Sequence, residues 1–246
     1  MKITIYPRGH SLSAFDLQHA LNQEIWEGDR AMRPSIRDRL LEIAYDFVAK
    51  NELAKEDIKD IIVTGSLANY NWSSYSDIDL HILIKFEEVD SNIELVKKFF
   101  DAVRSNWNKI HDIRVKGHEV EIYVQDHNEP HTSTGVYSII DDGWIVKPKP
   151  VRPHIDRGNV VKKASSLMGE INKIVSFYNH GKVERVLEDG AKLKEKLKHM
   201  RQSGLDRGGI FSVENLSFKV LRRSGHMGKL YVTMRKAYDQ SMSVPE

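Results

Sequence analysis

The stretch of sequence that decides the fold is residues 61–84, IIVTGSLANYNWSSYSDIDLHILI. The run Asp60–Thr64 is short and apolar, as is typical of a buried strand, and it leads into Gly65 and Ser66. After ten intervening residues, Asp77–Ile84 alternates between polar and apolar side chains, which predicts a second strand. The pattern therefore predicts two strands joined by a polar loop that begins with glycine and serine.

Two carboxylates fall on one face at the start of the second predicted strand. Alternate side chains of a strand share a face, so Asp77 and Asp79 project together while Ile78 points to the opposite face. Neighbouring carboxylates repel each other unless a cation lies between them. A hard divalent ion such as Mg²⁺, which takes carboxylate and phosphate oxygens as ligands, meets this need. Asp77 and Asp79 are therefore candidate metal ligands.

Gly65 and Ser66 are candidates for binding phosphate. A glycine at the end of a strand lets backbone N–H groups approach a ligand closely, and successive N–H groups form a concave anion-binding surface. The Ser66 hydroxyl adds a further donor. A phosphate site one loop away from a metal site is an arrangement suited to nucleotidyl transfer. In that reaction metal ions neutralise a triphosphate and activate the attacking hydroxyl.

This chemistry favours a third carboxylate on a neighbouring strand, and residues 118–125, HEVEIYVQ, supply two candidates. The segment alternates as a strand does, with Glu119, Glu121 and Tyr123 on one face. Glu121 has apolar neighbours on both sides and is the preferred metal ligand. Glu119, nearer the end of the strand, is the alternative.

The rest of the chain predicts an α+β fold in two domains. Pro148, Pro150 and Pro153 indicate a stiff connector, which divides a catalytic domain over residues 1–150 from a helical domain over residues 151–246. The first domain is expected to hold a mixed β-sheet with flanking helices. Its helices are expected near 34–48 and 93–110, and its further strands at 112–115, 119–125, 136–140 and 144–146.

The second domain is predicted as a small helical bundle. Its apolar stripes fall within residues 160–178, 183–200, 216–221 and 230–238. Gly204, Gly208 and Gly209 are expected to mark the turn between the second stripe and the third.

Composition excludes several classes of protein. Of the 246 residues 40% are hydrophobic and 29% are charged, as in an ordinary soluble globular protein. Cysteine is absent, so no disulfide, thiolate metal site or cysteine nucleophile is possible. The first ten residues, MKITIYPRGH, lack the apolar run of a signal peptide, and no stretch is long enough to span a bilayer. We expect a cytoplasmic protein with no membrane partner.

The net charge of +2 conceals a division along the chain. Residues 1–150 carry 18 Lys and Arg against 25 Asp and Glu, a net charge of −7, whereas residues 151–246 carry 19 against 10, a net charge of +9. A basic domain favours a polyanionic partner. The alternative is that its lysines only solvate exposed helix faces.

At this point the sequence resembles a known family. Gly-Ser, a loop of about ten residues, Asp-x-Asp on a strand and a later acidic residue between apolar ones is similar to the signature of the DNA polymerase β-like nucleotidyltransferase superfamily. The resemblance covers roughly residues 36–125. The sequence TGSLANYNWSSYSDIDLHI at residues 64–82, together with ENLSFKVLRRSG at residues 214–225, is similar to sequences of predicted nucleotidyltransferases encoded by tailed bacteriophages.

The resemblance implies a role for each matching residue. Asp77 and Asp79 would bind two Mg²⁺ ions, with Mn²⁺ as a substitute, and Glu121 would bind the catalytic ion and help to deprotonate the acceptor. Gly65 and Ser66 would hold the β- and γ-phosphates of an NTP, most simply ATP. The remaining candidates for nucleotide binding are Ser76 in the loop and, from the helical domain, Lys219 and Arg222, with Arg223 beside them. A phage-encoded enzyme would act in the host cytoplasm.

Several alternatives stay open. The 3′ end of RNA is the favoured acceptor because of the basic domain, and a small molecule, as in aminoglycoside nucleotidyltransferases, or a protein is the competitor. A non-catalytic or antitoxin-like module on the same fold is a third hypothesis. The loop aromatics Tyr70, Trp72 and Tyr75 either stack on a base or hold the loop in place. His81 continues the face of the two aspartates, and we expect a structural role for it.

Overall fold

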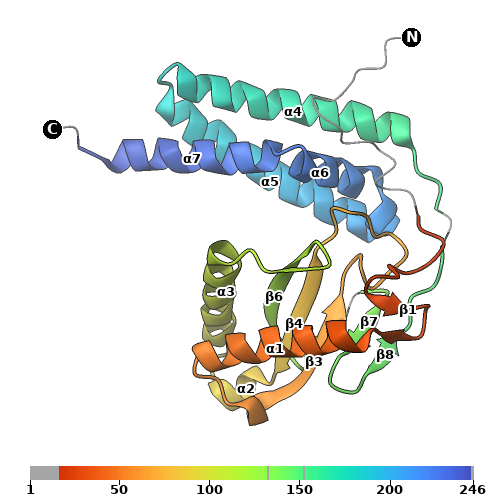
Figure 1. Cartoon of the computed structure of the whole chain (residues 1–246). Helices are drawn as coiled ribbons and strands as arrows, with labels where there is room; N and C mark the ends of the chain where they lie inside the picture. Colours follow the sequence, from red (N-terminus) through yellow and green to blue (C-terminus); the bar gives the residue numbers. More distant parts are fainter. Residues whose placement is uncertain (1–16, 132, 152, 245–246) are drawn as a thin grey trace. The chain divides into compact units, whose positions relative to one another are not determined.

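The computed structural model describes residues 17–131, 133–151 and 153–244. The initial MKITIYPRGH segment, on which the expectation about a signal peptide rests, lies outside the described residues. The chain divides between residues 152 and 153 into two compact units (Figure 1). We call them the sheet unit and the helical unit.

A six-stranded mixed sheet forms the centre of the sheet unit. Its strand order is β5-β6-β4-β3-β7-β8. The strands are β3 (Ile58–Thr64), β4 (Ile78–Ile84), β5 (Arg114–Val115), β6 (His118–Asp126), β7 (Val136–Ser138) and β8 (Gly143–Val146). The pair β4 and β6 is parallel, and the other pairs are antiparallel. The predicted 136–146 hairpin is confirmed.

Two amphipathic helices cover one face of this sheet, as Figure 1 shows. Helix α1 (Pro34–Lys50) begins with proline, which is pre-organised for a first turn, and buries Leu40 and Phe47. Helix α3 (Ile93–Ile110) begins at Asn92, whose side chain accepts a hydrogen bond from the Leu95 N–H. A one-turn helix, α2 (Phe86–Val89), lies between β4 and α3. The apolar face of the sheet therefore lies against the helices, and its polar residues lie on the other face.

An aromatic cluster holds the loop that follows β3. The short hairpin β1 (Trp26–Glu27) and β2 (Ala31–Met32) supplies Trp26, which is fully buried. The indole of Trp26 stacks on Trp144 at 4.6 Å and meets Tyr137 edge-on at 4.9 Å. Its Nε1–H donates to the carbonyl of Leu67 at 2.8 Å. Leu67 lies two residues beyond Gly65, so this cluster fixes the start of the loop.

The helical unit is a bundle of four helices in the described residues 153–244, as predicted (Figure 1). They are α4 (Arg157–Asn179), α5 (Val183–Gly208), α6 (Val213–Arg223) and α7 (His226–Met242). Fully buried residues such as Ile171, Val186 and Leu230 form its core. The predicted α+β class, a mixed sheet with helices followed by a helical bundle, is confirmed. None of the helices in the described part of the chain is long and apolar enough to cross a membrane.

One prediction about the bundle is wrong. Gly204 and Gly208 lie inside α5, and the turn begins only at Gly209, whose φ is +66°. Gly204 is glycine for a different reason, because a Cβ there would approach the Glu214 Cβ to 2.5 Å and the Ser212 Oγ to 2.8 Å. The start of α6 thus packs directly on the backbone of α5. Gly204 is needed for this close packing and not for a turn.

Candidate active site

The parallel pairing of β4 and β6 places the predicted carboxylates next to each other. Asp79 on β4 is in register with Glu121 on β6, and both side chains lie on the face of the sheet opposite α1 and α3. Asp77 directly precedes β4, which begins at Ile78. The structure thus brings Asp77, Asp79 and Glu121 to the same end of two neighbouring strands.

The same end of the sheet also carries the alternative residue Glu119. Burial raises the pKa of Glu119, the carboxylates of Asp77 and Glu121 raise it further, and Arg114 opposes them. The Arg114 guanidinium lies 3.6 Å from the Glu119 carboxylate. Negative charge is therefore concentrated here, and Glu119 has a cation of its own whereas Glu121 is the register neighbour of Asp79.

Gly65 lies against the Asp79 carboxylate. Its φ of +77° is in the left-handed region, where glycine alone is free of strain. A Cβ on residue 65 would overlap the Oδ2 atom of Asp79. The end of β3 therefore has to be glycine both for its backbone conformation and to leave room for Asp79.

The two predicted serines hydrogen-bond each other inside the loop. The Ser66 hydroxyl donates to Ser76 Oγ at 2.7 Å, and Ser76 Oγ accepts from the Ser73 N–H at 2.9 Å. Ser76 is buried and Ser66 half-buried. In this structure Ser76 joins the two ends of the loop, while Ser66 stands beside Gly65 at its start.

The loop aromatics divide between the two alternatives. Tyr70 is buried and its hydroxyl donates to Asp29 at 2.9 Å, and the Trp72 Nε1–H donates to the Ala20 carbonyl at 2.9 Å. These two residues hold the loop in place. Tyr75, with 48% of its surface exposed, is the one of the three that presents its ring to solvent.

His81 has the structural role that the sequence indicates. It contacts Thr64 Oγ1 through Nε2 at 3.2 Å and Gln125 Oε1 through Nδ1 at 3.1 Å. Burial, with smaller effects of His131 and Arg104, lowers the pKa of His81 to about 4. The imidazole is therefore neutral at neutral pH.

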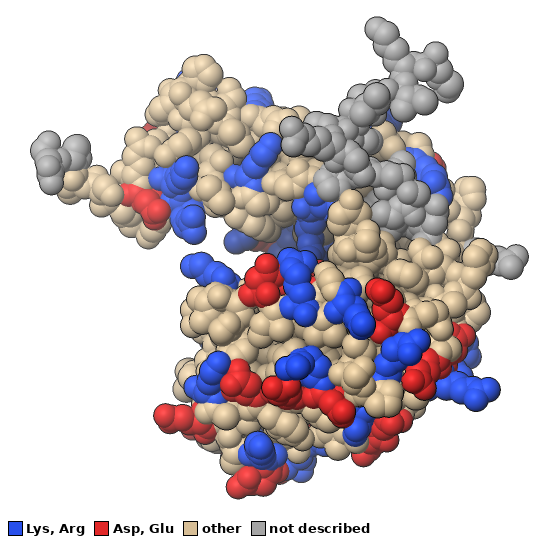
Figure 2. Space-filling view, viewed as in Figure 1, with Lys and Arg blue, Asp and Glu red and all other residues tan. Residues whose placement is uncertain are grey.

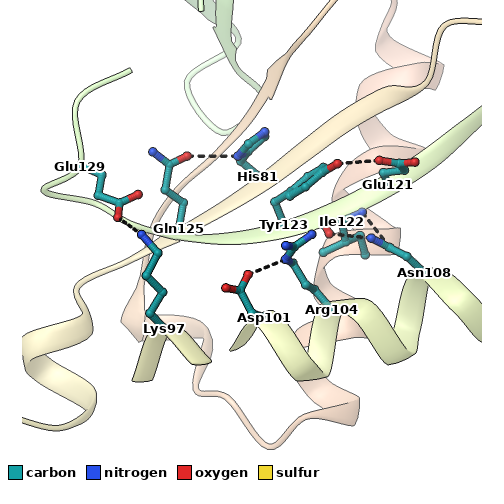
Figure 3. A network of polar contacts seen from close by, with 10 residues as sticks. All are labelled: His81, Lys97, Asp101, Arg104, Asn108, Glu121, Ile122, Tyr123, Gln125 and Glu129. Atoms are coloured by element: carbon teal, nitrogen blue, oxygen red, sulfur yellow. Dashed lines mark hydrogen bonds and ion pairs between the residues drawn. The ribbon is translucent and has the colours of Figure 1, made fainter. Parts of the chain in front are cut away.

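Three residues next to this site were not singled out from the sequence. The Tyr123 hydroxyl donates to Glu121 Oε2 at 2.5 Å, and burial, the bond to Glu121 and the charges of Asp79 and Glu121 raise the pKa of Tyr123 (Figure 3). Arg104 on α3 lies over the Tyr123 ring at 4.9 Å. Only the two-residue spacing of Glu121 and Tyr123 was visible in the sequence, because Arg104 and Asn108 come from another element.

Asn108 completes the hydrogen bonding of β6 at its outer edge. Its amide nitrogen donates to the Ile122 carbonyl at 3.0 Å, and its Oδ1 accepts from the Ile122 N–H at 3.0 Å (Figure 3). Strand β5 pairs only with His118 and Glu119, the first two residues of β6. Beyond them, the Asn108 side chain makes the hydrogen bonds that a longer neighbouring strand would otherwise make. The strand segment that carries Glu121 is thereby held from both sides.

The remaining predicted residues, Lys219 and Arg222, lie on α6 in the helical unit. Lys219 is half-buried and Arg222 exposed. They are not among the residues that the sheet unit brings together.

The carboxylates suit a divalent cation in type, but they do not form a closed ligand set. Among the described residues, no group of three or more His, Asp or Glu side chains is arranged to hold a metal ion. The acidic residues at the ends of β4 and β6 nonetheless supply the hard oxygen donors that Mg²⁺ prefers. Burial is the main cause of the raised pKa of Glu119, and the carboxylates of Asp77 and Glu121 add a repulsion that a cation would relieve.

The comparison with protein families agrees with this geometry. The family model described as nucleotidyltransferase domain matches residues 47–140, which include β3, β4, β6 and the loop between β3 and β4. This stretch is similar to nucleotidyltransferase domains of the polymerase β-like kind, the class that transfers NMP from an NTP. No curated protein and no solved structure matches the chain. Nothing in these comparisons is specific to bacteriophage proteins.

Proposed function

We propose that this protein is a Mg²⁺-dependent nucleotidyltransferase that moves NMP from an NTP, most simply ATP, to the 3′-hydroxyl of RNA and releases pyrophosphate. The observation that carries the proposal is the register of Asp79 with Glu121, with Gly65 against Asp79, within residues that match a nucleotidyltransferase domain. The spacing of these residues along the chain points to the same chemistry.

In this reaction the acceptor oxygen forms a bond to the α-phosphorus as the bond to the pyrophosphate oxygen breaks. Asp77, Asp79 and Glu121 would hold two Mg²⁺ ions, with Mn²⁺ as a substitute, and bound ions would neutralise the triphosphate and acidify the acceptor hydroxyl. Glu121, in register with Asp79, would bind the catalytic ion and help to take up the acceptor proton. The backbone N–H groups after Gly65, with the Ser66 hydroxyl, would bind the β- and γ-phosphates.

The charge of the helical unit supports RNA as the acceptor. Residues 151–246 carry a net charge of +9. In Figure 2, more Lys and Arg than Asp and Glu side chains are visible on the surface of the helical unit. A polyanion gains affinity from such a surface, whereas a cationic small molecule such as an aminoglycoside is repelled by it. Lys219 and Arg222 are proposed to contact the nucleotide.

The test is transfer of label from α-³²P-NTPs, supplied with Mg²⁺, to an RNA oligonucleotide with a free 3′-hydroxyl. The same oligonucleotide with a 3′-phosphate should stay unlabelled. Asp79→Asn and Glu121→Gln should lower the rate by on the order of a hundredfold or more, since each removes a charged metal ligand. Asp38→Asn, at an exposed position of α1, and Glu119→Gln should retain most of the activity.

The outcome also separates the alternatives. Label in a protein or a small molecule of a cell extract, with none in RNA, would replace the acceptor and keep the reaction. Absence of label in every fraction, with no effect of Asp79→Asn, would overturn the enzyme assignment and favour a non-catalytic module.

A further inference from the structure

We propose that Tyr123 is the positioning residue for Glu121, holding that carboxylate in the orientation in which it binds a metal ion. This inference rests on the proposed function, since it concerns one of the three proposed ligands. It begins with the strand: Glu121 and Tyr123 are two residues apart on β6, so both side chains lie on the same face. The Tyr123 hydroxyl donates to Glu121 Oε2 at 2.5 Å.

The ring of Tyr123 is clamped from both sides, as Figure 3 shows. On the side of β4, the imidazole of His81 stacks on it with centroids 4.8 Å apart and planes at 17°. On the side of α3, the Arg104 guanidinium lies 4.9 Å from its centroid. The phenol can therefore hold its hydrogen bond without losing further freedom of its own.

Both sides of this clamp are themselves anchored. The His81 ring contacts Thr64 Oγ1 at 3.2 Å. As Figure 3 shows, it also contacts Gln125 at 3.1 Å, and the Arg104 Nε–H donates to Asp101 at 2.8 Å. A chain of contacts thus runs from β3, β4 and α3 to a single carboxylate oxygen. Side chains that are fixed by such outer contacts keep a ligand in its binding geometry before the ion arrives.

The hydrogen bond fixes the carboxylate of Glu121 and leaves most of its acceptor capacity for the cation. An ionised carboxylate has about four lone-pair sites, and Tyr123 takes one of those on Oε2, so both sites of Oε1 and one of Oε2 remain for a metal ion. A glutamate without this bond would sample several rotamers, and ordering it would reduce the affinity for the ion. The hydroxyl of Tyr123, rather than its ring, is therefore the group that matters.

The experiment compares Tyr123→Phe with Tyr137→Phe in the full-length protein. Both variants keep the ring and remove a tyrosine–carboxylate hydrogen bond, because the Tyr137 hydroxyl donates to Asp142 at 2.6 Å elsewhere in the sheet unit. Binding of Mn²⁺ is measured by electron paramagnetic resonance with a non-transferable NTP analogue, together with the thermal midpoint. Tyr123→Phe should weaken Mn²⁺ binding by about tenfold, and Tyr137→Phe should leave it unchanged. Tyr137→Phe should lose more thermal stability than Tyr123→Phe, because the Tyr137 hydroxyl also accepts a buried hydrogen bond from the Met32 N–H at 3.1 Å.

Glu121→Gln and the double variant separate the possible failures. In the Glu121→Gln background, Tyr123→Phe should have no additional effect on Mn²⁺ binding, because the charged ligand that Tyr123 would position is already absent. If Glu121→Gln weakens Mn²⁺ binding and Tyr123→Phe does not, the positioning role is wrong and the proposed function stands. If Glu121→Gln itself has no effect on Mn²⁺ binding, Glu121 is not a ligand and the positioning role falls with it, whereas the proposed reaction is overturned only by the loss of transfer described above.

Discussion

At the scale of single residues, both the fold and the proposed chemistry depend on the absence of a Cβ atom at Gly65. Its left-handed φ of +77° turns the chain at the end of β3, and the space that a side chain would take is filled by the Asp79 carboxylate. The first property affects stability and the second affects Asp79. The two effects are separable, because the exposed Gly28 also has a left-handed φ but no neighbouring atom where a Cβ would lie.

Gly65→Ala should impair both stability and transfer, whereas Gly28→Ala should affect stability only. Gly28 has a φ of +60°, and a Cβ there would have no atom within 4 Å. We expect both to lower the free energy of unfolding by about 1–3 kcal/mol through backbone strain. Gly65→Ala should also reduce NMP transfer by at least about tenfold, since Asp79 must move. Urea unfolding and the labelled-NTP assay measure the two effects, and full activity of Gly65→Ala would contradict the role given to this contact.

The low pKa of His81 leads us to expect that the free energy of unfolding decreases in acid. Its pKa is about 4 in the fold against an ordinary value of 6.5, so between these pH values the unfolded chain binds a proton that the folded chain does not. Its contribution is fully present above pH 6.5 and is lost as the pH falls towards 4, by about 3 kcal/mol in total.

The measurement for His81 is urea unfolding at several pH values between 4 and 7. Wild type should lose stability more steeply than His81→Asn as the pH falls, since the variant lacks the titrating imidazole. His199→Asn, which removes an exposed histidine of α5, should follow the wild-type curve. Parallel curves for wild type and His81→Asn would show that His81 does not titrate in this way.

At the scale of elements, the junction of α5 and α6 depends on the close approach of the Ser212 and Glu214 side chains to the backbone of Gly204. Gly204→Ala should destabilise the protein by about 1–3 kcal/mol, because a Cβ there would meet Glu214 Cβ at 2.5 Å. Gly169→Ala, in α4 with nothing within 4 Å of its Cβ position, should stabilise it by about 0.5–1 kcal/mol through helix propensity. Thermal unfolding of the two variants should therefore give shifts of opposite sign. Stabilisation by Gly204→Ala would contradict the close packing.

The elements themselves were predictable where the signal is local. Helix α3 has the predicted bounds Ile93–Ile110, because its apolar stripe is regular and Asn92 caps its start. Strand β5 is shorter than the predicted 112–115, since only Arg114 and Val115 pair with β6. The order of the strands was not predictable, because the parallel pairing of β4 with β6 joins residues about 40 positions apart.

The candidate site divides in the same way. Asp77, Asp79 and Gly65 follow from spacing within one loop and its flanking strands. The sequence favours Glu121 over Glu119 because of its apolar neighbours, and the register adds that Glu121 lies beside Asp79, which no pattern along the chain shows. The bond of Tyr123 to Glu121 and the approach of Arg104 depend on packing between β6 and α3, and no pattern along the chain encodes that contact.

At the scale of the whole molecule, the charge is distributed as the proposed reaction requires. The carboxylates of the candidate site belong to residues 1–150, with a net charge of −7, and the basic surface belongs to residues 151–246, with +9. The acidic cluster can bind a triphosphate only with cations, whereas the basic residues attract a polyanion directly. Affinity for RNA should therefore come mainly from the helical unit.

Binding of RNA should consequently fall steeply with salt, and the fall should depend on residues of the helical unit. We expect the logarithm of the association constant to decrease linearly with the logarithm of the salt concentration, measured by fluorescence anisotropy with a labelled oligonucleotide. Arg222→Gln should weaken binding and lower the slope by about one if this residue contacts a phosphate. Lys98→Gln, at an exposed position of α3 beside Glu94, should change neither. A flat salt dependence would remove nucleic acid as the acceptor, because a surface of this charge that binds RNA must release counterions when it does so.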